Sequence, residues 1–580
     1  MRGKRSAEIL FALAAAVSPV AAWGQNWTNL NTGDWFTPSN WSPGTVPSSA
    51  SGVETVIDNA GTATIAGGNA SAVSLTLGDG VEGTVVQSGG TLAIAFAGSG
   101  TTSNNLFLGN QLDSFGTYQI SGAASKLSVE DAIYVGSNGF GTFKHQSGTV
   151  SAGALNIGSN TSINHGGGNY NLTTGTLTVG RVRIGQDWAT GSLGQGGGSI
   201  VLGGAGITDA FQLGSTSEGM DPHATYNLSA GSLSFSSSAT RGAARTLDFG
   251  VDGRAGFAQS GGSVDADVVR FASGSESGQT RWEMYGGTLG NSQTVIELGV
   301  ASGGGAPTAY IDGGTIAVAQ VKQNRGTMSF LSGSIAANRI AVGGSTEPQS
   351  SSWFMSGGTL TGDIIVGDTS GAGALHVSAG TINARDMVVG NDTRASELDI
   401  TSSAANITVS GDLVFKPTAV FKAVSGSIIR MTGSNFFNQS SDPSSMLGLN
   451  NLKLIFKGGS SVIDQYEVSS PAKGSTDVGF QSTLKVLQLG EGGTVGKVQL
   501  VDNFNNIPGA EALYVDQLIL GPGSQLNLNG QTVYYKSYIN TGGTLQLNGG
   551  QMVAYVPEPA GMAVLAVAAG AMMRRRGKKQ

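Results

Sequence analysis

Residues 145–160 read HQSGTVSAGALNIGSN and contain both motifs that recur along this chain. In one of them, LNIG at 155–158, two apolar residues flank a variable residue and a glycine follows. Glycine is replaced in two copies, VRFA and AQVK. The thirteen copies lie about 26 residues apart on average and start at Leu75, Leu106, Ile133, Leu155, Val182, Phe211, Leu247, Val269, Ile296, Ala319, Ile340, Ile364 and Met387. A recurring period of this length is typical of repeat proteins.

The other motif lies between these copies and reads QSGGTL or a close variant. Its copies start at Gln87, His145, Gln259, Met284, Met355 and Val377. Clusters of serine and glycine mark tight turns, because glycine tolerates the positive φ angles that sharp bends require. Each repeat is therefore predicted to run strand, glycine turn, strand, SGGT turn, strand.

The alternation within each strand predicts how the repeats associate. Side chains of a strand point alternately to its two faces, so the two apolar residues of LNIG share one face. One repeat is too short to bury that face, whereas stacked repeats join their apolar faces into a continuous core. The predicted fold is all-β, a parallel β-helix of about 13 coils over residues 66–410. At about 4.8 Å per coil it forms a rod of roughly 60 Å.

This repeat region is similar to the passenger-type β-helices of bacterial surface proteins. The open strand edges at both ends of such a rod must be covered. Residues 23–65 contain Trp27, Trp35 and Trp41 among turn residues and resemble the Trp-rich leader of many such repeat proteins. They are predicted to form an N-terminal cap, because large aromatic side chains usually pack into cores. The alternative is a platform on which sugars stack.

Residues 411–553 no longer show the regular motif but contain longer alternating segments, such as residues 511–535. We expect either a smaller C-terminal β region or an irregular continuation of the rod. The high glycine content, 93 of 580 residues against a usual share of about 7%, agrees with a chain of strands and turns.

Composition also excludes several classes of function. The chain has no cysteine, so disulfides, thiolate catalysis and cysteine-based metal sites are ruled out. Its net charge is −7, and both ends are basic, so the middle is more acidic still. An acidic body lacks the basic footprint of a nucleic-acid-binding protein.

Residues 1–22 have the features of a secretory signal peptide. Arginine and lysine come first, residues 9–17 are apolar, and small residues precede a cleavage site expected after Ala22. The apolar stretch is too short to span a membrane stably. The chain is therefore predicted to be exported.

Residues 554–580 form a second terminal signal in three parts. The apolar part is shorter than the roughly 20 residues of a membrane-spanning helix, but it can lodge in the inner membrane with the arginines on the cytoplasmic side. The two prolines keep the preceding segment extended and accessible. In order, the parts are Pro557, Glu558 and Pro559; the apolar residues 560–573; and Arg574, Arg575 and Arg576.

This tail closely resembles the PEP-CTERM sorting signal of Gram-negative bacteria. In that family an exosortase, a membrane transpeptidase, recognises the signal, and the carrier is delivered to the cell surface or its exopolysaccharide matrix. The resemblance implies exosortase as a partner, with transient inner-membrane contact through both termini. The alternative is a membrane protein anchored by an uncleaved tail.

No convincing catalytic constellation is found in the sequence, and no cofactor or metal site is predicted. Asp248, Arg270 and Glu297 occupy the variable position in consecutive repeats, so they should stack about 5 Å apart. We interpret them as a surface ladder of ion pairs, although paired carboxylates on a β-helix can also act as acid and base. The histidines lack the local spacing of a metal site or triad; they are His145, His165, His223 and His376.

Three functions remain open at this stage. The first is a structural or adhesive protein of the cell surface or matrix, with exopolysaccharide as a possible partner. The second is a carbohydrate-active enzyme on the same scaffold, a polysaccharide lyase or a glycoside hydrolase. The third is a carbohydrate-binding module. Carboxylates gathered in a cleft on adjacent coils would favour the enzyme.

Overall fold

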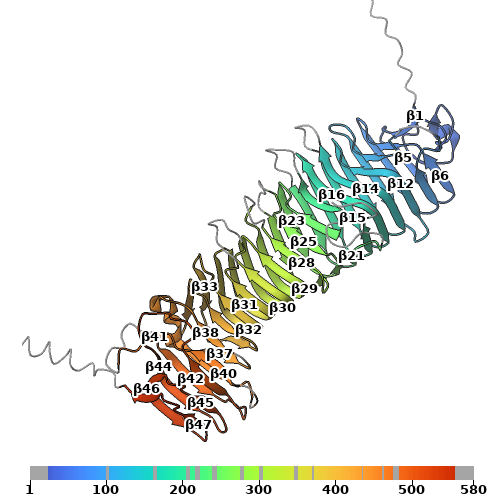
Figure 1. The fold of residues 1–580 in the computed structure, drawn as a ribbon. Helices are drawn as coiled ribbons and strands as arrows, with labels where there is room; N and C mark the ends of the chain where they lie inside the picture. Colours follow the sequence, from blue (N-terminus) through green and yellow to red (C-terminus); the bar gives the residue numbers. More distant parts are fainter. Residues whose placement is uncertain are drawn as a thin grey trace, which may run out of the picture.

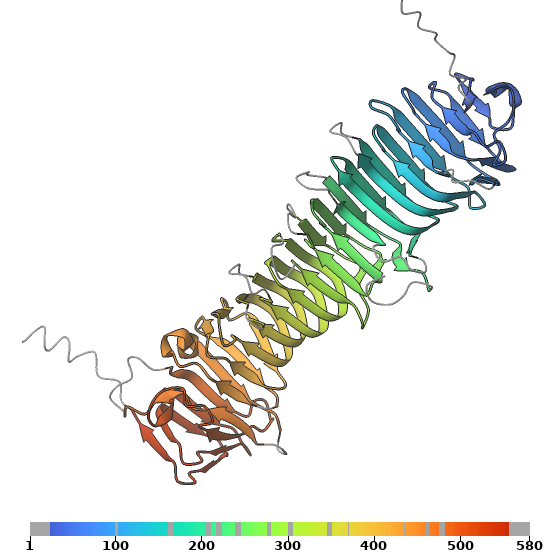
Figure 2. The ribbon, with the colours of Figure 1, turned by 45° about the horizontal axis from the view of Figure 1, so that its top comes forward.

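The structure of the chain is a computed structural model. It describes residues 24–98, 103–160, 166–203, 210–215, 223–237, 245–274, 280–299, 305–344, 351–368, 371–433, 435–459, 461, 463–474 and 482–555. The chain is nearly all β, with 60% strand and 3% helix. Its strands wind into an elongated rod, with β1 (Gly24–Trp27) near one end and β47 (Thr544–Gln546) near the other (Figures 1 and 2). The predicted all-β, β-helix-like fold is confirmed.

The strands form three parallel stacks along the rod, named here the first, second and third stack. In β29 to β32, one long strand passes through all three. These four are β29 (Thr308–Gln323), β30 (Gly326–Val342), β31 (Ser351–Val366) and β32 (Gly373–Val389).

The first stack carries the LNIG-type motif. Besides β1, β47 and parts of β29 to β32, it comprises β4 (Glu54–Ile57), β7 (Leu75–Leu77), β10 (Leu106–Leu108), the later halves of β12 (Lys126–Val135), β14 (Thr149–Asn160) and β16 (Thr176–Asp187), β19 (Phe211–Ser215), β22 (Thr246–Phe249), β25 (Val268–Phe271), β28 (Val295–Leu298), β35 (Leu413–Phe415), β38 (Phe436–Asn438), β40 (Asp464–Glu467), β43 (Lys497–Val501) and β45 (Gln525–Asn527).

The second stack leads into the SGGT turn and the third leaves it. The second comprises β2 (Thr32–Asp34), β5 (Thr62–Ile65), β8 (Glu82–Gln87), β11 (Phe115–Ile120), β13 (Phe140–His145), β15 (Gly167–Leu172), β17 (Thr190–Gln195), β20 (His223–Leu228), β23 (Arg254–Gln259), β26 (Thr280–Met284), β33 (Ser396–Ile400) and β36 (Ala419–Ala423). The third comprises β6 (Asn69–Ala72), β9 (Thr91–Ile94), the first halves of β12, β14 and β16, β18 (Ser199–Leu202), β21 (Ser232–Phe235), β24 (Ser263–Val264), β27 (Thr288–Leu289), β34 (Ala405–Val409), β37 (Ser427–Met431), β39 (Leu452–Phe456), β42 (Leu484–Leu489), β44 (Glu511–Leu520), β46 (Thr532–Asn540) and β48 (Gln551–Ala554).

The register of the first stack confirms that successive motif copies meet in one interior. Leu155 pairs with Ile133 of the preceding coil and Val182 of the following coil, and all three are buried. Ile184 and Leu213 continue the neighbouring inward position and are buried as well. A single core cluster extends from Trp27 to Val533. Burial of apolar surface along the whole rod is therefore what holds the coils together.

One predicted strand was placed in the wrong register. The copy AQVK was expected to point Ala319 and Val321 inward and Gln320 outward. Val321 is buried as expected, but it pairs with Ile296, the first apolar residue of the preceding copy, and Lys322 pairs with Glu297 and takes its outward position. The next inward residue is Gln323, which is fully buried and whose Nε2 donates to the carbonyl oxygens of Gly326 and Ser352. A motif defined by two apolar residues does not match a strand in which one of the two inward residues is polar.

At the end of the second stack, one inward position alternates between polar and apolar residues from coil to coil. Each of its members is in register with the next, and all are buried. The pattern repeats every two coils, twice the length of the motif repeat. In chain order the residues are Gln87, Ile120, His145, Leu172, Gln195, Leu228 and Gln259.

Each of the first three polar residues in this column binds a buried tyrosine of the next coil. Gln195 accepts a hydrogen bond from the Tyr226 hydroxyl at 2.7 Å, while its Nε2 donates to the Ser232 carbonyl at 3.0 Å. Buried polar groups are stable only when they are paired in this way. The two equivalent pairs are Gln87 with Tyr118, at 2.6 Å, and His145 with Tyr170, at 2.9 Å.

The N-terminal segment buries all three of its tryptophans. β1 pairs in antiparallel orientation with β3 (Trp41–Ser42) and in parallel orientation with β4. Trp41 packs edge-to-face against Trp27 and Trp35, with ring centroids 4.8 Å apart in both pairs. The burial agrees with a cap and not with an exposed platform for sugars.

The C-terminal region continues the parallel pairing of the rod. In the third stack, β37 is followed by β39, β42, β44, β46 and β48, and side chains of these strands belong to the same core cluster. A short helical segment, η3 (Pro443–Asn451), packs against β36. A small additional cluster on the side contains Tyr514, Tyr534 and Tyr555. The strands of this region therefore extend the same stack and the same core as the repeats.

Candidate functional site

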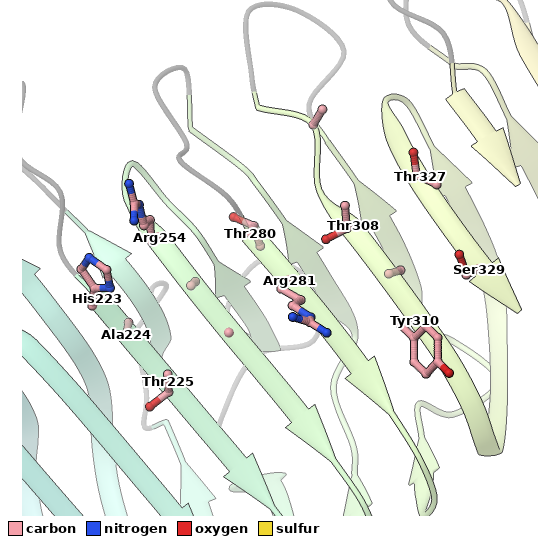
Figure 3. A pocket seen from close by; sticks show the side chains of 14 residues that line it. His223, Ala224, Thr225, Arg254, Thr280, Arg281, Thr308, Tyr310, Thr327 and Ser329 are labelled. Carbon is pink, nitrogen blue, oxygen red and sulfur yellow. The ribbon is translucent and has the colours of Figure 1, made fainter.

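A groove of about 750 Å³ lies on the outer face of the second stack (Figure 3). It crosses β20, β23, β26, β29 and β30, so five neighbouring coils contribute to it. Its lining combines basic, hydroxyl and small side chains. The lining residues are His223, Ala224, Thr225, Arg254, Ala255, Gly256, Thr280, Arg281, Ala306, Thr308, Ala309, Tyr310, Thr327 and Ser329.

A glycine leaves open space in the floor of the groove. In the register of the stack, Gly256 lies between Thr225 and Arg281. A Cβ atom added at Gly256 would contact only the Thr225 methyl group, at 3.7 Å. The groove is therefore open space above an ordinary strand, and a larger side chain at this position would fill it without straining the backbone.

Three basic side chains surround this space although the chain as a whole is acidic. His223 and Arg254 are paired in register, and Arg281 follows on the next coil; all three are exposed. No carboxylate occurs among the described residues that line the groove. Glu283, just beyond it, forms an ion pair with Arg281. The groove is thus suited to an anionic ligand.

Two tyrosines lie on the coils of β26 and β29, which the groove crosses. Tyr310 is in its lining, and Tyr285 is 48% exposed, with the two ring centroids 5.9 Å apart. A tyrosine offers both an apolar face and a hydroxyl group to a ligand. Together with the threonine and serine hydroxyls, these rings can contact a polyhydroxylated chain that runs across the coils.

The predicted charge ladder is present on the first stack. Arg270 lies between the two carboxylates, with its Nε 2.9 Å from Glu297 Oε2 and its Nη1 3.8 Å from Asp248 Oδ1. The corrected register places Lys322 after Glu297, so the signs alternate over four coils. The carboxylates are engaged with the arginine, which agrees with an ion-pair ladder.

A second depression, of about 550 Å³, contains two carboxylates next to each other, Glu130 and Asp131. The register of β12 shifts between Val129 and Ala132, which places both residues at an irregular corner. Asn104 holds them, donating from Nδ2 to Glu130 at 2.9 Å and from its backbone N–H to Asp131 at 2.7 Å. Substituting these two carboxylates tests the alternative that the chain is a polysaccharide lyase or glycoside hydrolase, because such enzymes use paired carboxylates as acid and base.

The described histidines have three different environments. His145 is fully buried, and burial lowers its pKa to about 4. His223 lies in the groove. His376 is close to Glu397 and Asp399, and these three could hold a metal ion. The fourth, His165, lies outside the described residues.

The His376 cluster was missed because its members are far apart in sequence. The cluster could have been found by aligning LHV at 375–377 with LDI at 398–400, since Leu375 pairs with Leu398 and His376 with Asp399. The groove has no comparable signal, because it depends on the sizes of side chains on five coils.

The residues singled out in both predicted targeting signals lie outside the described residues. They comprise Ala22 at the N-terminus and, in the tail, Pro557, Glu558, Pro559, Arg574, Arg575 and Arg576. In the part of the chain that is described, no helix has the length and apolar character needed to cross a membrane.

Comparisons with protein-family models, with curated proteins and with solved structures found no match to this chain.

Proposed function

We propose that this chain is an exported rod that acts as a structural, adhesive protein at the cell surface or in the surrounding matrix, where its groove binds an acidic polysaccharide. The observation that carries this proposal is the groove itself, in which His223, Arg254 and Arg281 gather on an otherwise acidic chain. Carboxylate groups of a polysaccharide would pair with the guanidinium groups, and arginine is well suited to bind carboxylates through two hydrogen bonds.

The shape of the rod supports an adhesive role. A groove that crosses five coils is open along the rod axis, so a polymer can lie in it without presenting a free end. The continuous core gives the groove a rigid base, and a preorganised site loses less entropy on binding.

Delivery is the second part of the proposal. Residues 1–22 direct export, and an exosortase that recognises Pro557, Glu558 and Pro559 cleaves the tail of the exported chain. Intact-mass measurement of the protein recovered from the cell surface tests this step. The expected mass lacks Arg574, Arg575 and Arg576, whereas a surface protein that retains them would contradict processing.

The groove is tested with polygalacturonate as an acidic probe and dextran as a neutral one. We expect the purified chain to bind polygalacturonate, with an affinity that falls as salt screens the charges, and not to bind dextran. Arg254→Gln and Arg281→Gln should each weaken binding about tenfold, the effect of losing one charge-assisted hydrogen bond. Gly256→Tyr should block binding, because the ring would occupy the groove.

The matched control is Lys144→Gln, which removes an exposed positive charge from β13 on the same face but outside the groove. If this variant weakens binding as much as Arg254→Gln, the attraction is general and the groove is not the site. If the polymer is instead cleaved, and Glu130→Gln or Asp131→Asn abolishes cleavage, the chain is an enzyme.

A further inference from the structure

We infer that His376, Glu397 and Asp399 form a binding site for a divalent transition-metal ion of the zinc class on the outer face of the second stack. One ligand atom from each residue, His376 Nδ1 and one carboxylate oxygen from each acid, lies within 4.8 Å of the other two. The three residues come from β32 and β33 on adjacent coils, where His376 is in register with Asp399.

The distances between the ligand atoms are close to those of a tetrahedral site. His376 Nδ1 is 3.3 Å from Asp399 Oδ2 and 3.9 Å from Glu397 Oε1. Zinc bonds of about 2.0–2.2 Å at tetrahedral angles place ligand atoms about 3.3–3.5 Å apart. The two carboxylate oxygens lie within 4.8 Å of each other, so side-chain rotations that shorten these separations would bring all three atoms onto one ion.

The donor set distinguishes between classes of metal. An imidazole nitrogen suits zinc, copper and nickel, whereas calcium and magnesium prefer oxygen ligands alone. Three protein ligands leave the fourth position of a tetrahedral ion for water or an outside ligand. The three side chains are 21% to 24% exposed, so an ion can enter directly from solvent.

Two neighbouring residues hold the ligands in place. The Phe354 ring stacks on the His376 imidazole, with centroids 4.8 Å apart and planes at 10°. Lys422 Nζ lies 2.7 Å from Glu397 Oε2, while Oε1 of the same carboxylate is the oxygen near His376. Fixed ligands favour binding, but the lysine charge opposes a second cation nearby.

The experiment uses the untagged full-length chain. Calorimetry with zinc chloride in the presence of excess calcium should show one site per chain, and cobalt should give the visible absorption of a tetrahedral complex. Zinc should also raise the melting temperature, because it binds the folded chain and joins two coils. His376→Gln and Asp399→Asn should each weaken binding at least tenfold, since even outer partners of a ligand contribute that much.

Two further variants make the result specific. Lys422→Gln should bind zinc several-fold more tightly, because it removes the competing charge. Glu82→Gln, which removes an exposed carboxylate from β8 of the same stack, should bind zinc as the wild type does. The inference is overturned if zinc does not bind, or if His376→Gln and Asp399→Asn retain full affinity while folding normally.

Discussion

At the scale of single residues, Gly158 shows what a corner of the rod requires. Its φ of +63° lies in the left-handed region, and an added Cβ would be far inside van der Waals contact with the Thr190 carbonyl oxygen. Gly158→Ala is expected to lower the free energy of unfolding by roughly 2–4 kcal/mol. About 1–2 kcal/mol comes from the backbone conformation and the rest from the displaced neighbour.

The matched control for this substitution is Gly492→Ala. Gly492 has a similar φ of +58°, but an added Cβ would have nothing within 4 Å. It should therefore show only the backbone part of the loss, about 1–2 kcal/mol. Urea unfolding of both variants measures the difference, and equal losses would show that close packing against Thr190 has no effect.

His145 makes the stability of the rod depend on pH. Burial lowers its pKa to about 4, whereas a histidine in the unfolded chain titrates near 6.5. As the pH falls below 6.5, the unfolded state takes up a proton that the native state refuses until about pH 4. Stability should therefore fall over this window by about 3 kcal/mol from this residue alone.

His145→Gln isolates this contribution. Glutamine occupies equivalent positions at Gln87 and Gln195, where it pairs with tyrosine as His145 does. The variant should fold and lack this part of the pH dependence. Urea unfolding between pH 7 and pH 4 gives the free energy of unfolding of both chains. If it falls equally in both as the pH is lowered, folding does not lower the pKa of His145.

At the scale of strands, the motif spacing predicts the first stack well because its two apolar residues and following glycine have separate physical roles. Apolar pairs enter the core, and glycine makes the turn. The prediction fails at β29, where Gln323 is buried and Asn324 replaces the glycine. There the side-chain amide satisfies backbone carbonyls, and this use of a polar residue has no signature in hydrophobicity.

Aligning the strands predicts one of the candidate sites from the sequence but not another. Once the strands are aligned, the pairing of Asp248, Arg270 and Glu297 follows directly from sequence. The groove does not, because it depends on the sizes of side chains that five coils bring together. The exact width of each coil also depends on turns whose lengths differ, so neighbours across coils can be identified only locally.

At the scale of the whole molecule, the alternating column predicts that the rod tolerates changes of two coils better than changes of one. Deleting residues 146–195 removes two coils and places the Tyr226 hydroxyl beside His145. In the intact chain His145 binds the hydroxyl of another tyrosine, Tyr170. Deleting residues 173–195 removes one coil and places the Tyr226 hydroxyl beside Leu172. The smaller deletion should be about 1–3 kcal/mol less stable, the loss from one unpaired buried group.

Thermal unfolding followed by circular dichroism compares the two deletions. The larger deletion should retain the higher melting temperature although it removes more of the core. If the one-coil deletion melts at the same or a higher temperature, the pairing of tyrosines with Gln87, His145 and Gln195 does not set the spacing of the coils.

The stacking of coils also determines how the rod would respond to force. Each coil is bonded mainly to the coil before it and the coil after it, so a pull between the two ends can peel coils away one at a time. A coil of about 26 residues spans about 90 Å when drawn out but occupies only about 4.8 Å in the rod. A cell attached through such a molecule would be held by a tether that lengthens in small steps under shear force. A brief high force would then lengthen the tether and would not detach the cell.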